Sequence, residues 1–240
     1  MWVADIIDMK TIKLGFIALL LGIAGSTVAA EKAELDGRIR MLTAKLEAMQ
    51  QKADKAIPAD NFRKAQGIIL LDRTKAGFIF AYQGGGGVAL VKDPKTEQWG
   101  PAAFLTANEA SLGFQVGGEQ TFFAILLMST NATRLLSEPN VTAGGEARGT
   151  AGDSTAAVEA KVSPTEQSVL VYSDRRGLYG GAAIKGGAIA PDEQANREYY
   201  GQLLTMKEIL FENKVKPTEA ATGLASKLRE YSKSSGVSSN

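Results

Sequence analysis

The sequence predicts an α+β protein, in which a curled, mainly antiparallel, glycine-rich β-sheet (barrel-like or sandwich) carries an N-terminal amphipathic helix and C-terminal helices. Three observations predict this fold. Apolar residues follow a helical period early in the chain, short apolar runs separated by glycines fill the middle, and helical signals return at the end. With 240 residues, 45% of them hydrophobic, the chain is long enough to bury a substantial core.

Residues 1–30 have the pattern of a secretory signal peptide. Two lysines precede an apolar run over residues 14–24, and small residues up to Ala30 suit a signal peptidase. The run is near half of the roughly 20 residues that a membrane span needs, which favours cleavage near Ala30 over a retained anchor. Acidic residues ahead of Met9 leave open whether Met1 or Met9 is the true start. We expect an exported protein, periplasmic or envelope-associated in a bacterium.

Residues 31–57 are predicted to form an amphipathic helical arm. Apolar side chains recur at steps of four and three from Leu35 to Ala56, and Pro58 should end the helix. Basic and acidic residues mix along the flanks, and the apolar face carries no aromatic residue. The residues alone therefore favour packing on the protein's own core or on a partner helix over a place in a lipid interface. They do not decide between packing and the lipid interface.

Residues 58–231 are predicted to hold the sheet and the later helices. Strands are expected at 67–72, 76–82, 87–92, 114–116, 122–128, 168–172 and 178–184. The run from Gly84 to Gly87 lacks the lysine and the following helix of a phosphate-binding loop, and we interpret it as a mobile hairpin tip. Helices are expected at 131–136 with Asn131 as the cap, from Pro191 to Tyr200, at 205–211 and at 218–231, before a disordered tail over 232–240.

The chain contains no histidine and no cysteine. This excludes disulfides, imidazole or thiolate metal ligands, and Ser-His-Asp or Cys-His catalysis. The carboxylates show no paired spacing, so nothing supports a two-carboxylate enzyme, and we expect no catalytic residue, no metal and no cofactor. A net charge of +1 gives no support to nucleic-acid binding.

Basic residues gather locally in the predicted helix and around two of the predicted hairpins. If they converge in the fold, their side chains could hold phosphate oxygens; the alternative for each one is a solvated turn. The candidate lipid-binding residues are Arg38, Arg40, Lys45, Arg63, Lys64, Arg73, Lys75, Arg175, Arg176 and Lys185.

Glycine and aromatic motifs occur in a fixed order between residues 60 and 212. The motif residues are Trp99 and Pro101, then Gly113, Gln115 and Gly117, then Gly177, Leu178, Tyr179 and Gly181, then Asn196, Tyr199, Tyr200 and Gly201. Their types and order resemble the SYLF family. We interpret them as mainly structural, with Gln115 as a buried amide that ties strands together. The chain departs from the family at residues 121–123, Thr-Phe-Phe, where members commonly have an acidic residue.

The resemblance implies a SYLF-like domain over residues 58–231 that binds lipid and has no enzymatic activity. Combined with the signal peptide, it predicts docking on anionic phospholipid membrane surfaces of the cell envelope. The family also implies that the N-terminal segment contacts membrane. The alternative is an envelope scaffold that acts through its N-terminal helix, by pairing with a protein partner or with itself. Some eukaryotic members bind actin, which we expect to be an unlikely partner for an exported bacterial protein.

Overall fold

The computed structural model describes residues 31–76, 82–107, 120–137, 141–142, 168–175, 177–180 and 188–233. The predicted signal peptide, the predicted strand at 114–116 and residues 234–240 lie outside this part of the chain.

Eight strands form one sheet within the described residues, and every pair of neighbours is antiparallel. The order β5-β8-β3-β2-β1-β4-β6-β7 leaves β5 and β7 at the edges, so the sheet is open. The predicted α+β class with an antiparallel sheet is confirmed. The strands are β1 (Gly67–Ala76), β2 (Tyr82–Val91), β3 (Ala103–Ala107), β4 (Gln120–Leu127), β5 (Val141–Thr142), β6 (Val169–Ser173), β7 (Gly177–Gly180) and β8 (Ala188–Pro191).

The glycine run from Gly84 to Gly87 lies inside β2, so its interpretation as a hairpin tip was wrong. β1 and β2 pair without interruption until Ala76 meets Tyr82, and Gly86 pairs with Asp72. A Cβ on Gly87 would stand 2.6 Å from the backbone oxygen of Leu70. Glycine is therefore required there by the close approach of two strands, which is a common reason for glycine inside a sheet.

Three strands, β3, β5 and β8, were missed because nothing in their sequence separates them from loops. β3 follows the Trp-Gly-Pro segment, and β8 ends at Pro191, which was expected to open a helix. The helix α4 (Glu193–Tyr200) instead begins after Asp192, whose side chain accepts a hydrogen bond from the Ala195 amide at 3.1 Å. An aspartate cap satisfies a free amide of the first turn, which proline does not.

Side-chain caps also open two of the other short helices. Ser129, rather than Asn131, caps α3 (Thr130–Arg134), and a 3-10 turn, η2 (Leu135–Ser137), follows. Thr205 forms a capping box with Glu208 at the start of α5 (Met206–Leu210). The remaining helices are α2 (Ala59–Lys64), which was not predicted, and α6 (Glu219–Lys233), which runs two residues past its predicted end.

The N-terminal helix covers residues 31–50 and stops well before Pro58. The side chain of Gln50 accepts a hydrogen bond from the Ile57 amide at 2.7 Å and donates one to the Ile57 carbonyl at 3.2 Å. This pair of bonds closes residues 51–57 into a turn, and the predicted continuation of the helix to Ala56 was wrong.

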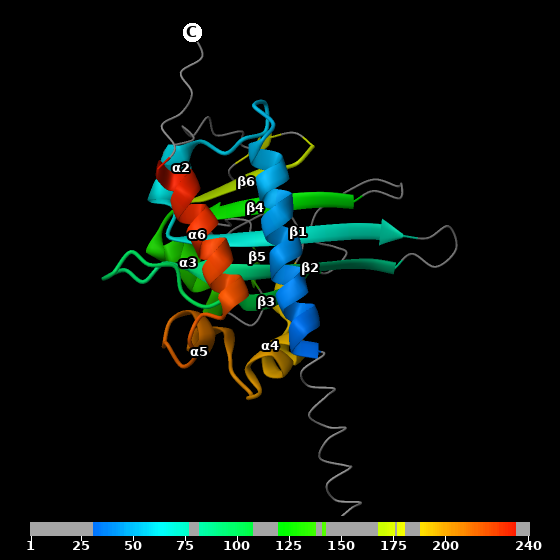
Figure 1. The fold of residues 1–240 in the computed structure, drawn as a ribbon, viewed down its shortest axis with the longest axis vertical. Helices are drawn as coiled ribbons and strands as arrows, with labels where there is room; N and C mark the ends of the chain where they lie inside the picture. The colour runs from blue at the N-terminus through cyan, green and yellow to red at the C-terminus, as the bar shows by residue number, and fades with distance from the viewer. Residues whose placement is uncertain are drawn as a thin grey trace, which may run out of the picture.

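Two apolar clusters lie on the two faces of the sheet. Figure 1 shows the N-terminal helix and α6 crossing one of these faces. The N-terminal helix, α2, α4 and α6 pack on what we call the helix-side face, and α3, η2 and α5 pack on the opposite face. The apolar seam of the N-terminal helix is at most 4% exposed, and its members are Leu35, Ile39, Leu42, Leu46 and Met49. Burying one such side chain stabilises a protein by about 1.5–3 kcal/mol, so this helix is part of the main core.

Candidate functional site

Two candidate basic residues of the N-terminal helix are used inside the fold. The Arg38 guanidinium lies 3.3 Å from the Asp192 carboxylate and 5.6 Å from the centre of the Phe104 ring. The Lys45 ammonium lies 2.6 Å from the carboxylate of Asp72, which is on β1. Both side chains are about 30% exposed, so these ion pairs are partly shielded from water. Arg40, in contrast, is exposed on the same helix.

Arg63 and Lys64 lie at the C-terminal end of α2. Both form ion pairs with Asp60, at 2.9 and 2.6 Å, and all three side chains are at least half exposed. Arg63 also donates a hydrogen bond to the backbone oxygen of Ser232 in α6. Exposed pairs of this kind contribute little to stability, so both cations can change partners at low cost.

The backbone places Arg73, Lys75 and Arg175 at the opposite end of the sheet, where β1 ends at Ala76 and β2 begins at Tyr82. We call this the hairpin end. Arg73 pairs with Thr121 of β4, and Lys75 pairs with Gln83 of β2. β6 ends at Ser173, which pairs with Phe123 of β4, and the exposed Arg175 follows it by two residues in the same direction as Thr121. The fold thus brings three of the ten candidates to one end of the sheet, two on β1 and one just beyond β6, with β4 between them. Arg176 and Lys185 lie outside the described residues.

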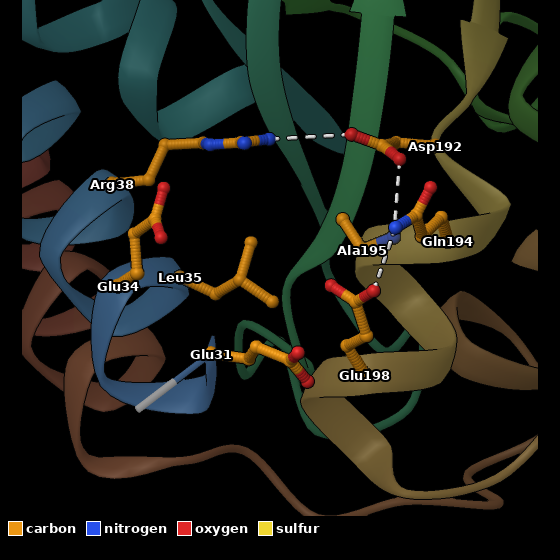
Figure 2. A pocket seen from close by; sticks show the side chains of 8 residues that line it. All are labelled: Glu31, Glu34, Leu35, Arg38, Asp192, Gln194, Ala195 and Glu198. Carbon is orange, nitrogen blue, oxygen red and sulfur yellow. Dashed lines mark hydrogen bonds and ion pairs between the residues drawn. The ribbon is translucent and has the colours of Figure 1, made fainter. Parts of the chain in front are cut away.

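A cleft of about 230 Å³ opens between the N-terminal helix and α4 (Figure 2). Among the described residues that line it, four are acidic and only Arg38 is basic; the acidic residues are Glu31, Glu34, Asp192 and Glu198. The field in this cleft is negative, which disfavours phosphate groups. No cluster of three carboxylates in the described residues has a metal-binding arrangement. The cleft is therefore not a site for an anionic headgroup.

The Asn196 side chain completes the hydrogen bonding of β3. Its carbonyl oxygen accepts from the Phe104 amide at 2.8 Å, and its amide group donates to the Phe104 backbone oxygen at 3.0 Å. β8 pairs with β3 only at residues 105–107, so Asn196 takes the place of a strand partner just beyond it. The residue is 1% exposed and locks α4 against the sheet.

Tyr199 links three helices through its hydroxyl group. It donates a 2.5 Å hydrogen bond to the Asp36 carboxylate of the N-terminal helix, and it also bonds the hydroxyl of Thr218, which caps α6. Tyr200 donates to the backbone oxygen of Ala102 at 2.5 Å. Burial raises the pKa of both phenols well above the usual value, and the bond to Asp36 raises the pKa of Tyr199 further. These motif residues hold helices in place.

Some of the remaining motif residues lie in the described part of the chain, and four lie outside it. Trp99 is 7% exposed and stacks under the ammonium of Lys92, which lies 5.0 Å from the ring centre. Gly201 has φ = 66° and ends α4 in the left-handed conformation. Gly177, Leu178 and Tyr179 form β7, and Pro101 is buried beside β3. The residues Gly113, Gln115, Gly117 and Gly181 lie outside the described part of the chain, so the proposed role of Gln115 stays a prediction.

Lys92 is a buried cation that the sequence reasoning missed. Its ammonium donates to the backbone oxygens of Phe62 at 3.3 Å and Arg63 at 2.9 Å, and so caps the C-terminal end of α2. Burial lowers the pKa of Lys92. A lysine directly after an apolar strand usually marks the strand's exposed end, so no sequence signal pointed to this role.

Comparison with known proteins identifies relatives. Residues 108–231, just over half of the chain, match the family described as "Ysc84: Las17-binding protein actin regulator". "LAS seventeen-binding protein 3" of Saccharomyces cerevisiae is 33% identical over 176 residues, and "Protein YSC84" of the same yeast is 35% identical over 176 residues. Each alignment covers 72% of this chain. The human "SH3 domain-containing YSC84-like protein 1" is 30% identical over 169 residues, which is 70% of this chain.

These relatives are longer than this chain. The alignments span 38% and 37% of the two yeast proteins and 49% of the human protein. No solved structure matches the chain. The names of the family and of these relatives describe binding and regulation rather than catalysis. By the match over residues 108–231, this chain belongs to the Ysc84 family, which carries the SYLF domain that its motifs resemble.

Proposed function

We propose that this protein is an exported, non-enzymatic domain that docks on anionic phospholipid surfaces of the cell envelope through the hairpin end of its sheet. The observation that carries the proposal is that Arg73 and Lys75 of β1 and Arg175, just beyond β6, lie at the same end of the sheet, with β4 between the two strands. Arginine and lysine bind phosphate oxygens, and several cations close together attract an anionic surface more strongly than isolated ones.

The N-terminal helix is a weaker candidate for the docking surface. Its apolar seam is buried against the sheet, and its cations Arg38 and Lys45 already face carboxylates. The acidic cleft beside Arg38 would repel phosphate groups. Because the seam is buried, a scaffold that pairs with a partner through it would first have to open the core. None of the described helices has the length and apolar content to cross a bilayer.

The absence of histidine and cysteine and the names of the relatives both favour binding over catalysis. Export rests on the pattern of residues 1–30. Mass spectrometry of the protein from its native host should find a mature N-terminus near Glu31. A mature chain that still contains residues 14–24 would contradict cleavage.

Vesicle sedimentation tests the docking proposal. The protein should sediment more with vesicles of phosphatidylcholine and phosphatidylglycerol than with phosphatidylcholine alone, and high salt should reduce the difference. Charge reversal of Arg73, Lys75 and Arg175 to glutamate should abolish the difference. Reversal of Arg73 and Lys75 alone should already reduce the difference more than reversal of Arg63 and Lys64, the charge-matched control at the other end of the sheet. Equal sedimentation of the wild-type protein with both vesicles contradicts the proposal.

The names of the relatives favour a second candidate, a role in binding actin or an actin-regulatory protein. Our expectation that actin is an unlikely partner rested on export alone, and the comparisons do not support it. Co-sedimentation with actin filaments tests this candidate directly. Binding that survives the charge reversal at the hairpin end would assign actin to a surface separate from the one proposed for lipid.

A further inference from the structure

We infer that the N-terminal helix stays packed on the sheet when the protein docks on a membrane, and that its contacts with β1 and β2 hold the hairpin end in place. This inference rests on the proposed function. It concerns how the domain docks: the folded body meets the headgroups through charged residues, and the buried seam of the helix does not enter the bilayer.

Polar contacts tie this helix to three other elements along its length. Asp36 accepts the 2.5 Å hydrogen bond of Tyr199, and Arg38 pairs with Asp192, both at α4. Lys45 pairs with Asp72 of β1 at 2.6 Å. Glu47 pairs with Lys227 of α6 at 3.1 Å. An apolar seam alone would allow the helix to slide or rotate, whereas these contacts fix one position.

Two of these contacts lie where β1 and β2 leave the core for the hairpin end. Asp72, which Lys45 holds, immediately precedes Arg73 in β1. Its partner in β2 is Gly86, and a Cβ on that glycine would stand 3.5 Å from the Arg38 guanidinium. The helix thus contacts both strands one position before the cationic end begins. Figure 1 shows the helix crossing the strands beside α6.

Release of the helix would expose the whole apolar seam and break all these polar contacts. The seam belongs to the same cluster as the central strands β1, β2 and β4, so releasing it would uncover the core of the sheet. The net free energy of unfolding of a domain is small. The free energy lost when a full layer leaves its core is larger, so the domain would unfold. Docking by the intact body avoids this loss.

A cross-link tests whether the helix stays in place. The chain has no cysteine, so Glu47→Cys with Lys227→Cys creates one reactive pair at an exposed contact between helix and α6. A short bismaleimide reagent then joins the helix to the body. The full-length double variant should bind acidic vesicles, relative to neutral ones, equally before and after cross-linking, within about twofold. The Lys227→Cys single variant, treated with the same reagent, is the control for modification.

The outcomes separate the two proposals. Loss of the acidic preference only after cross-linking means that the helix must leave the sheet, and it overturns the inference while the proposed function stands. Loss of that preference in the untreated wild-type protein overturns the proposed function and the inference together. Unchanged binding after cross-linking supports both.

Asp72→Asn tests the supporting role, because charge and support predict opposite effects. The substitution removes a negative charge and frees Lys45, so electrostatics alone predicts tighter binding to acidic vesicles. Weakened support of β1 predicts looser binding, with circular dichroism showing an intact fold. Binding that is unchanged or tighter overturns the supporting role, and looser binding in a folded variant supports it.

Discussion

The two faces of the sheet are held in different ways. On the helix-side face, polar side chains join helix to helix, as Tyr199 does to Asp36, and helix to strand, as Lys45 does to Asp72 and the Asn61 amide to the Tyr172 hydroxyl at 2.6 Å. The opposite face is covered by short helices that contribute apolar side chains to one cluster with the strands. Apolar burial supplies stability to both faces, and the polar bonds give the long helices of one face a single position.

The largest expected effect tests whether both faces contribute equally to stability. Leu42→Ala removes a fully buried side chain on the helix-side face, and Ile209→Ala does so on the opposite face. Each should lower the free energy of unfolding by about 2–5 kcal/mol in chemical denaturation, because each leaves a cavity in a packed core. A much smaller cost for Leu42→Ala would mean that the N-terminal helix is only loosely attached.

The next effect tests the amide that joins α4 to the sheet. Asn196→Leu keeps the volume but leaves the Phe104 amide without its acceptor, and an unsatisfied buried donor costs about 1–3 kcal/mol. The Phe104 oxygen keeps the Asp192 amide as a donor. Gln194→Leu, at an exposed position of the same helix, is the control and should change the denaturation midpoint little. Equal effects of both substitutions would contradict the role of Asn196.

Alkaline pH should weaken the helix-side face through its tyrosines. Burial raises the pKa of Tyr199, Tyr172 and Tyr231, all of which pack in that layer. A raised pKa in the folded state means that stability is complete below the unfolded value of about 10 and falls as pH rises beyond it. Tyr199→Phe should cost about 1 kcal/mol at neutral pH and flatten the alkaline decline in denaturation experiments. An unchanged decline would assign the effect to other groups.

The smallest effect is a gain in stability on the helix-side face. Gly223 lies on the exposed side of α6, and a Cβ there would meet nothing within 4 Å. Gly223→Ala should raise the free energy of unfolding by about 0.5–1 kcal/mol, because alanine loses less backbone entropy in a helix. Gly37→Ala in the N-terminal helix, where the space is also open, should give a similar gain. Thermal melting measures both, and a loss in either variant would reveal an unrecognised contact.

Local patterns predicted most of the elements, and long-range pairing explains the errors. β1 was cut short because Arg73, Thr74 and Lys75 are polar, although they continue the same ladder, the first two opposite glycines of β2 and Lys75 opposite Gln83. Pro191 looked like the start of a helix, but it closes a strand whose partner, β3, has no signal of its own. Arg73, Lys75 and Arg175 were candidates from sequence, whereas their convergence depends on the order of β1, β4 and β6.

The sequence alone determined the α+β class, the helical seam from Leu35 to Met49, the lack of histidine and cysteine chemistry, and the family motifs, because periodicity and composition are local properties. Tertiary structure decided what each feature is used for. In the fold, the seam is buried in the core, the glycine run is part of β2, and Arg38 and Lys45 form ion pairs with carboxylates of the same chain. The physical reason is that a charge or an apolar side chain acts on whatever lies within a few ångströms, and strand order fixes those neighbours.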